Sequence, residues 1–432
     1  MVMKEMRTYG LPFTQHSNAT KEDLEQVQLH KLNHMLTFLL QYNRFYQNKL
    51  ADIKLPLRSM ADLTRLPFTT KKELVEDQKQ YPPYGQNHTF PLERYIRYHQ
   101  TSGTTGKPIK ILDTEESWNW WAECWVKVLR SAGVTERDIV FLAFHFGPFI
   151  GFWAAYEGAK KAGALVFPGG GQTSEQRLAN ILENQATVLM CTPSYALHLA
   201  EVANKQNIDI KNSSVRIIIT AGEPGGSIPS VRNQIESLWG AKLYDHVGMT
   251  EMGAYGYACA EQKGLHVNEE EFIVEVINPD TGEHVQEGER GELVLTNLGR
   301  WGYPLVRYRT GDMVIFTQKR CSCGHPYHFL PGGIIGRADD MVVIRGINIF
   351  PQSIEAIVRE FDNIDEFRIV YYTQNQMDQI KVQVEGKEID IPLLEKKLRE
   401  RIGLRIEVEK VASGTLPRFE MKSRRVLDQR ER

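Results

Sequence analysis

Four short apolar runs, separated by amphipathic segments, constrain the fold of this chain more than any other feature. The runs are IVFLAFHF, ALVFPG, ATVLMCTP and VRIIITAG, and they lie between residues 139 and 222. Apolar residues at helical spacing fill the segments between them, at residues 152–162, 174–184 and 194–206. This alternation is typical of βαβ units, which predict a parallel sheet that gathers ligands at the carboxyl ends of its strands.

Other regions flank these units. Helical spacing predicts a packing helix over residues 22–48, and the turn signals PDTGE and EGERGE predict a smaller antiparallel β layer over residues 272–316. Helical and β-rich segments between residues 352 and 411 predict a small α+β unit. We therefore expect an α/β fold with a large N-terminal domain, residues 1–338, and a small mobile C-terminal domain, residues 339–432.

Charge and composition exclude several classes of function. The chain has 52 Lys and Arg against 54 Asp and Glu, so it lacks the basic field that attracts nucleic acid or an anionic membrane. It has no apolar run of about 18 residues, and its first residues are too polar for a signal peptide. Five cysteines are too few for a disulfide framework. The sequence predicts a cytoplasmic protein with small-molecule partners, no nucleic acid and no membrane, and it leaves a homodimer open.

A loop rich in Gly, Ser, Thr and Lys lies in the stretch TSGTTGKPIKI. It is not the loop of a P-loop NTPase, because that motif needs a glycine where this chain has Thr101 and a Ser or Thr where it has Pro108. The extended run after Pro108 predicts that the loop joins two strands. Small residues let donors approach an anion closely, so the loop could wrap a polyphosphate. The candidate phosphate-binding residues are Thr101, Ser102, Gly103, Thr104, Thr105, Gly106 and Lys107.

The stretch TSGTTGKP resembles the phosphate loop of the acyl-adenylate-forming superfamily. Further motifs agree with it in order and spacing: AGEP at 221–224 is similar to the adenine loop, and DHVGMTE at 245–251 to the segment that ends in Thr-Glu. YRTGD at 308–312 is similar to the ribose motif, and GRADDMVVIRGINIFPQSIE at 336–355 to the hinge region. Within the superfamily, LPFTTKKEL, CSCG and the compact length look most like phenylacetate-CoA ligase and related aryl-CoA ligases. The resemblance covers nearly the whole chain.

This resemblance implies an ATP site. Thr250 and Glu251 would lie at the α-phosphate and Mg²⁺, where a hard cation prefers a carboxylate oxygen. Asp312 would accept hydrogen bonds from the ribose, Arg337 would donate near the ribose or phosphate, and Asp245 would accept from the adenine amino group. The other residues expected to bind nucleotide are Ala221, Gly222, Glu223, Pro224 and His246.

A lysine near the C-terminus, Lys422 in LPRFEMK, resembles the family lysine that reaches into the active site during adenylation. Met421 stands where a glycine commonly precedes that lysine, and a plain surface lysine is the alternative. The resemblance implies that the small domain then rotates about Asp339. The face around Arg345 and Gly346 would thereby replace the lysine and admit the thiol of coenzyme A.

An aromatic cluster follows the first apolar run, at the place where the family has its carboxylate pocket. Such a wall suits an aryl acid, although core packing explains the aromatic residues about as well. The candidate substrate-binding residues are His145, Phe146, Gly147, Phe149 and Gly248.

Cysteine and histidine spacing predicts a metal site. Three thiolates and one imidazole would close a tetrahedral zinc site with no open position, which is typical of a structural metal. Buried free thiols are the alternative reading, and His325 and His328 compete as the nitrogen ligand. The candidate ligands are Cys259, His266, Cys321 and Cys323, whereas Cys124 and Cys191 are expected in the core.

The sequence thus predicts an ATP-dependent acid:CoA ligase, for an aryl acid such as phenylacetate, that uses ATP, Mg²⁺, coenzyme A and a structural Zn²⁺. An acyl-adenylate would form first, because AMP leaves more readily than oxide. One alternative keeps adenylation but passes the acyl group to an amine, a hydroxyl or a carrier-protein thiol. Another is a non-catalytic nucleotide or aryl-acid binding protein; its one support is Val247, which stands where the family generally stacks an aromatic ring on adenine.

Overall fold

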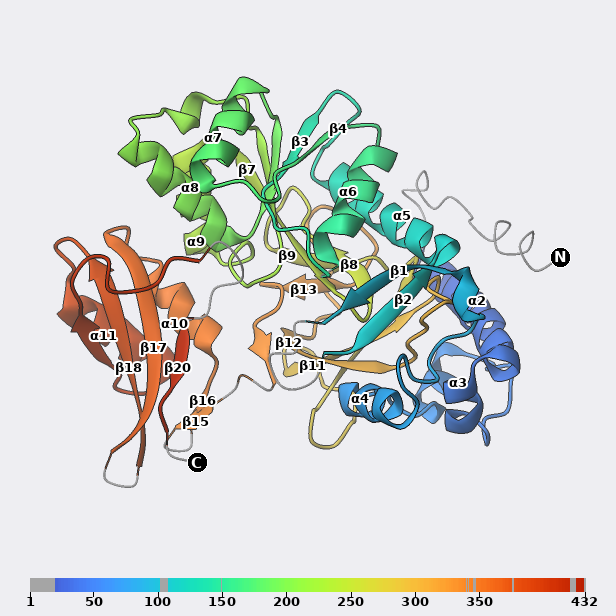
Figure 1. Ribbon diagram of the computed structural model, residues 1–432. Coiled ribbons are helices and arrows are strands. Elements are labelled where there is room, and N and C mark those ends of the chain that lie inside the picture. The colour runs from blue at the N-terminus through green and yellow to red at the C-terminus, as the bar shows by residue number, and fades with distance from the viewer. Residues whose placement is uncertain are drawn as a thin grey trace.

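The computed structural model describes residues 20–101, 108–148, 150–338, 340, 342–344, 347–374, 377–419 and 425–430. Figure 1 shows a larger body and, beside it, a smaller C-terminal unit coloured orange and red. Buried apolar side chains form a main core in the larger body, a satellite core under the N-terminal helices, and a separate core in the smaller unit. Among the helices within these ranges, none has the length and apolarity that a bilayer crossing requires.

A central sheet organises the larger body. In spatial order its strands are β13 (Phe329–Pro331), β9 (Gly264–Val267), β8 (Gly253–Tyr257), β7 (Lys242–Met249), β6 (Ile217–Thr220), β5 (Val188–Cys191), β3 (Ile139–Leu142) and β4 (Leu165–Pro168). Strands β3 to β7 pair in parallel, whereas β8, β9 and β13 join in antiparallel register. The predicted parallel βαβ arrangement is confirmed.

Helices cover both faces of this sheet (Figure 1). Strand β3 lies between β4 and β5, so the strand order reverses there, and ligands of open α/β sheets bind at such a switch point. Three of the helices that follow strands begin at a threonine cap: the side chain of Thr114 accepts from Ser117 N, that of Thr173 from Gln176 N, and that of Thr192 from Tyr195 N. The helices are α5 (Glu115–Ser131), α6 (Gly151–Lys161), α7 (Ser174–Glu183), α8 (Pro193–Lys205) and α9 (Pro229–Trp239).

The predicted antiparallel layer is also present. It has the order β10 (Phe272–Ile277), β11 (Arg290–Asn297), β12 (Tyr308–Ile315) and β14 (Gly336–Arg337). A separate hairpin of β1 (Tyr95–Gln100) and β2 (Lys110–Thr114) carries residues 101–109 between its strands, as the sequence predicted for the glycine-rich loop.

The N-terminal helix differs from the prediction of one helix over residues 22–48. It divides into α2 (Lys21–Tyr42) and α3 (Arg44–Lys49) at Asn43, which is buried. The amide of Asn43 donates to Asn87 Oδ1 and Thr89 Oγ1, and its Oδ1 accepts from Tyr46 N, so its side chain caps the second helix. After the short 3₁₀ helix at Met60–Arg65, α4 (Lys71–Gln80) follows; further 3₁₀ turns lie at Leu92–Arg94 and Ile210–Asn212.

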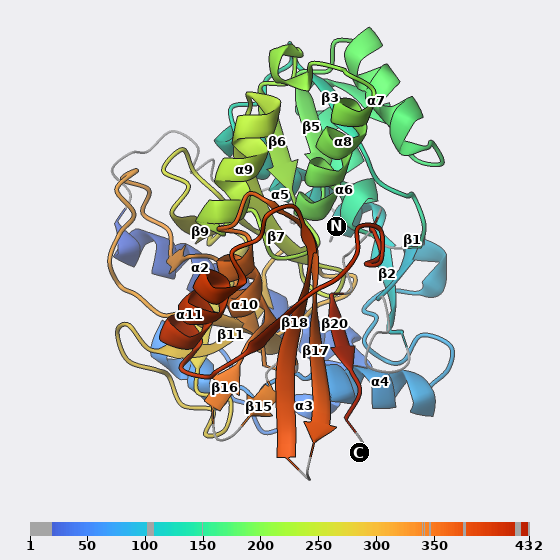
Figure 2. The same cartoon turned by 90° about the vertical axis from the view of Figure 1, so that its left-hand side faces the viewer.

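The C-terminal unit is α+β, as predicted. Its sheet has the order β19 (Glu407–Lys410), β18 (Met377–Gly386), β17 (Ile364–Gln374) and β20 (Val426–Asp428), and Figure 2 shows β18, β17 and β20 side by side. Helices α10 (Pro351–Val358) and α11 (Ile391–Ile402) and the hairpin of β15 (Val342–Ile344) and β16 (Ile347–Ile349) complete it. Helix α10 contacts α9, where Ser230 Oγ donates to Ala356 O at 3.1 Å. The domain boundary itself stays a prediction, because Asp339 lies outside the described residues.

Helices α5 and α6 meet at a glycine, which provides a test of this packing. A Cβ added at Gly158 would lie 2.3 Å from the Cβ of Trp125 and 3.2 Å from the carbonyl oxygen of Ala122. Replacing a helical glycine by alanine ordinarily stabilises a protein by about 0.5–1 kcal/mol. We expect Gly158→Ala instead to lower the free energy of unfolding by about 1–3 kcal/mol, because the two helices must separate. Denaturant unfolding measures this, and a gain in stability would contradict the packing.

Candidate active site

The carboxyl ends of β5, β6 and β7 bring several of the predicted residues to one edge of the central sheet. Residues 221–224 directly follow β6, and Ala221 N donates to Cys191 O of the neighbouring strand at 3.2 Å. Gly222 has a φ of 93°, a left-handed conformation that glycine adopts without strain. The carboxylate of Glu223 accepts from Ser194 N at 2.8 Å, at the first turn of α8. The predicted adenine loop is therefore tied to the adjacent strand and helix.

Asp245 and His246 lie next to each other on β7 but in different surroundings. The carboxylate of Asp245 accepts from Ser227 Oγ at 2.5 Å and from Thr220 Oγ1 at 3.2 Å, and burial raises its pKa from 3.8 to about 6. The ring of His246 packs on Trp125 at 4.1 Å, with its Nδ1 2.7 Å from Gly256 O. Burial lowers the pKa of His246 to about 4, so this imidazole is neutral near pH 7.

Thr250 and Glu251 form the turn between β7 and β8, and the fold brings a lysine to them. Glu251 is buried, and its Oε1 lies 3.7 Å from Nζ of Lys71, the first residue of α4. Lys71 was not predicted as a site residue, although it lies in the LPFTTKKEL stretch. On the preceding strand, a Cβ added at Gly248 would lie 2.8 Å from Gly253 O, so the hairpin closes tightly there.

Arg300, which was not predicted from the sequence, binds the backbone of this turn. Arg300 Nη1 donates to Thr250 O at 2.8 Å and to Glu251 O at 2.9 Å. The other side of its guanidinium forms a bidentate pair with Asp113 of β2, with distances of 2.7 and 2.6 Å. Neither side chain of this ion pair is exposed. A lone arginine in GRWGYP gives no sequence signal for such a role.

The predicted ribose motif also comes together. Asp312 on β12 faces Arg337 on β14, and Arg337 Nη1 donates to Asp312 Oδ1 at 3.0 Å. Tyr255 Oη donates to Asp312 Oδ2 at 2.8 Å. Tyr255 was not predicted, because in the strand pattern GAYGYA it reads as a core residue. The tyrosine and the arginine fix the orientation of the carboxylate.

Three of the residues predicted for the acid pocket, His145, Phe146 and Gly147, lie in the loop after β3, next to the strand-order switch, whereas Gly248 lies on β7. The Phe146 and Trp153 rings meet edge to face at 4.9 Å, and Trp153 Nε1 donates to Gly147 O at 3.0 Å. A Cβ added at Gly170 would lie 2.7 Å from the Phe146 ring, so the glycine run after β4 borders the same loop. His145 is exposed. An aromatic wall is thus present, and its ligand is a matter for proposal.

Several predicted residues lie outside the part of the chain that the structure describes. Thr101 is described: its N donates to Ile109 O and its Oγ1 accepts from Ile109 N, both at 3.0 Å, so it closes the base of the loop. The predicted residues outside the described ranges are Ser102, Gly103, Thr104, Thr105, Gly106, Lys107, Phe149, Asp339, Arg345, Gly346 and Lys422.

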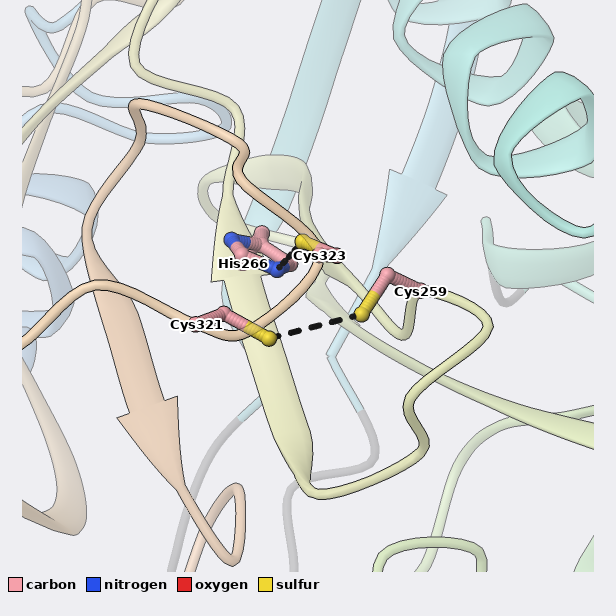
Figure 3. Close-up of side chains that lie close together, drawn as sticks. All are labelled: Cys259, His266, Cys321 and Cys323. Carbon is pink, nitrogen blue, oxygen red and sulfur yellow. Dashed lines mark hydrogen bonds between the residues drawn. The ribbon is translucent and has the colours of Figure 1, made fainter.

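The four predicted metal ligands form one cluster (Figure 3). One donor atom from each of Cys259, His266, Cys321 and Cys323 lies within 4.8 Å of all the others. The Cys259 and Cys321 sulfurs are 3.7 Å apart, about the separation that tetrahedral Zn–S bonds of about 2.3 Å require, and Cys323 Sγ is 3.3 Å from His266 Nε2. This donor set therefore fits Zn²⁺. His325 and His328 are not in the cluster, and the His328 ring stacks on Phe316.

Comparison with known proteins agrees with this site. The family model for the AMP-binding enzyme matches residues 48–299, and that for the AMP-binding enzyme C-terminal domain matches residues 346–430. The phenylacetate-coenzyme A ligase of Pseudomonas putida is 34% identical over 95% of this chain and 95% of its own length. The chain therefore belongs to the AMP-binding enzyme family and, within it, to the AMP-forming acid–CoA ligases related to phenylacetate-CoA ligase.

Solved structures of one enzyme, 2-hydroxyisobutyryl-CoA ligase, resemble this chain over nearly its whole length. In the postadenylation state, with R3-HIB-AMP, that enzyme has a TM-score of 0.90 and 28% identity, over 97% of this chain and 94% of its own. In the thioesterification state, with 2-HIB-AMP and CoA, the TM-score is 0.72 at 30% identity, over 95% of this chain and 91% of its own. The arrangement described here is thus more similar to the postadenylation state.

The pKa of Asp245 predicts a pH effect on stability. A carboxyl group whose pKa is raised in the folded state contributes stability that is present below its ordinary pKa of 3.8 and is lost as the pH rises through about 6. Asp245→Asn cannot ionise, so the variant should gain about 2 kcal/mol on the wild type between pH 4 and pH 7. Unfolding free energies across this range measure the difference. The exposed Asp280→Asn serves as control, and a difference that does not change with pH would contradict the assignment.

Proposed function

We propose that this enzyme activates an aryl acid such as phenylacetate with ATP, through an acyl-adenylate, and transfers the acyl group to coenzyme A. The observation that carries the proposal is that Arg300 joins the Thr250–Glu251 turn to Asp113 of the β1–β2 hairpin. Tyr255, on the strand after that turn, donates to Asp312 of the Asp312–Arg337 pair. Similarity to the P. putida enzyme, a phenylacetate-coenzyme A ligase, supports the acid and the acceptor.

The residues divide the work of adenylation as follows. Asp312 accepts from the ribose hydroxyls and Arg337 donates beside it, while residues 221–224, Asp245 and His246 border the adenine. Residues 101–107 donate to the phosphates. Thr250 and Glu251 face the α-phosphate, and Glu251 would hold Mg²⁺, which supplies positive charge to the triphosphate. The donor chemistry fits this role: Glu251 is a buried carboxylate whose Oε1 lies 3.7 Å from Nζ of Lys71, and Mg²⁺ prefers such an oxygen ligand.

The acid would bind against the Phe146 and Trp153 rings, with His145, Gly147, Phe149 and Gly248 around it. Aromatic rings supply apolar area and edge-to-face contacts for an aryl group. Lys422 would bind the carboxylate and α-phosphate oxygens, and this charge is most useful where negative charge accumulates in the transition state.

We further propose that the two half-reactions use two domain arrangements. Rotation about Asp339 would withdraw Lys422 and bring Arg345 and Gly346 to the thiol of coenzyme A. The two states of 2-hydroxyisobutyryl-CoA ligase support this. They match similar shares of this chain, yet the TM-score is higher for the postadenylation state than for the thioesterification state, so the difference reflects how the parts are arranged. Residues 1–338 and 339–432 would then be the bodies that move.

The cysteine and histidine cluster is proposed as a structural zinc site. Four protein ligands leave no open position for a substrate. Cys259 follows β8, His266 lies on β9, and Cys321 and Cys323 lie in the loop before β13, so the cluster joins these three segments. Free thiols of this kind persist in a reducing compartment, so we propose a cytoplasmic location. A homodimer is kept as a proposal for the oligomeric state.

Pyrophosphate exchange tests the function directly. Phenylacetate should stimulate ATP–pyrophosphate exchange without coenzyme A, and coenzyme A should be required for thioester formation. Glu251→Gln removes the metal-binding charge while keeping the shape, so exchange should fall about 100-fold or more. The exposed Glu93→Gln is the control. Wild-type exchange in Glu251→Gln would contradict the assignment, and product formation with an amine but not with coenzyme A would favour another acceptor.

Metal content tests the zinc proposal. Protein purified without added zinc should contain about one equivalent per chain, and Cys321→Ser should lose the metal and unfold at a lower temperature. Cys124→Ala changes a buried thiol outside the cluster and should keep the zinc. Elemental analysis with thermal unfolding measures both. Metal-free wild-type protein of normal stability would exclude the site.

A further inference from the structure

Arg300 connects two parts of the candidate nucleotide site that are far apart in the sequence. Its Nε and Nη2 contact both oxygens of Asp113 on β2, the strand that follows the glycine-rich loop. Its Nη1 contacts the carbonyl oxygens of Thr250 and Glu251. One guanidinium therefore joins the hairpin that carries the loop to the turn that carries the candidate metal ligand.

The surroundings of Arg300 make this connection rigid. Both members of the ion pair have side chains with 0% exposure, and the guanidinium lies 4.3 Å from the centre of the Trp121 ring. Removing one partner of a buried ion pair strongly destabilises the fold, because the other charge is then left buried without compensation. A lysine at this position could supply the charge but not the planar fork that contacts a carboxylate and two carbonyls together.

We propose that Arg300 is a positioning residue that sets the distance between the Thr250–Glu251 turn and the phosphate-binding hairpin. This inference rests on the proposed function. Arg300 binds the backbone of Glu251 and not its carboxylate, whose only ion pair in the described structure is with Lys71, so loss of the fork should displace the carboxylate and weaken the binding of Mg²⁺ with ATP before it affects later chemistry. Residues that orient metal ligands typically contribute about 10–100-fold to metal affinity.

The chain offers a matched control for a purely structural effect. Arg307 forms an equivalent buried pair, with Nε 2.9 Å and Nη2 2.7 Å from the oxygens of Glu275. Its Nη1 donates to Leu66 O at 2.6 Å and to Thr64 O at 3.3 Å. Its partners are not candidate site residues, so Arg307→Lys should reproduce the loss of stability without the loss of metal affinity.

The experiment compares Arg300→Lys, Arg307→Lys and wild type. Calorimetric titration of ATP at several Mg²⁺ concentrations gives the Mg²⁺ concentration for half-maximal binding, and thermal unfolding reports stability. In Arg300→Lys the Mg²⁺ concentration for half-maximal ATP binding should rise at least about 10-fold, while in Arg307→Lys it should match the wild type. Conversion of a supplied phenylacetyl-adenylate to thioester should stay near the wild-type rate in both variants.

Equal Mg²⁺ requirements in the two lysine variants would overturn the inference, even if both lose stability. If Arg300→Lys does not fold, Asp113→Asn provides the comparison: it removes one charge, keeps the arginine, and should raise the Mg²⁺ requirement in the same direction; no change would overturn the inference. Failure of the proposed function has a different signature, because wild-type protein would then show neither Mg²⁺-dependent ATP binding nor acid-dependent exchange.

Discussion

The candidate site depends on strand β7, which pairs in parallel with β6 on one side and antiparallel with β8 on the other. Thr220 pairs with Asp245 in parallel register on one side, and Val247 pairs with Gly256 in antiparallel register on the other. The parallel neighbour brings residues 221–224 to the same edge of the sheet, and the antiparallel neighbour turns the chain sharply at Thr250 and Glu251. A single strand therefore fixes the predicted adenine loop and the Thr250–Glu251 turn relative to each other.

Buried ion pairs supply the second level of organisation. Arg300 with Asp113, Arg307 with Glu275, and Arg425 with Glu366 each connect segments that are distant in the chain. Arginine suits this task because its fork contacts a carboxylate and backbone carbonyls at once. These pairs are costly to desolvate, so we read them as devices that fix geometry more than as sources of net stability.

Sequence patterns predicted the parts of the fold that depend on local rules. The four apolar runs became β3 to β6, each followed by an amphipathic helix. β3, β5 and β6 are largely buried, as continuously apolar parallel strands are, whereas β4 lies at the edge of the sheet and is partly exposed. The division of the first helix was missed, since Asn43 acts through Asn87 and Thr89, which are distant in the sequence. The short strand β20 was also missed, because three residues carry too little pattern.

The residues of the candidate site likewise fall into those that sequence motifs predict and those that only tertiary contacts reveal. Motifs identified Asp312, Arg337 and the four candidate metal ligands, and the fold brings each set together. Lys71, Tyr255 and Arg300 could not be predicted, because their roles arise from tertiary contacts and their local sequences read as a helix start, a core strand and a turn. Their positions can be found only once the strands are arranged in space.

The fate of the oxygen atoms of the acid shows whether the enzyme works through an acyl-adenylate. If the carboxylate attacks the α-phosphate of ATP and the thiol then displaces AMP, phenylacetate labelled with ¹⁸O in both carboxylate oxygens must pass one label to AMP. Mass spectrometry of the products from a reaction with ATP and coenzyme A measures this transfer. Activation through an acyl-adenylate predicts one ¹⁸O atom in AMP and none in pyrophosphate. Label in inorganic phosphate, or unlabelled AMP alongside thioester, would contradict activation through an acyl-adenylate.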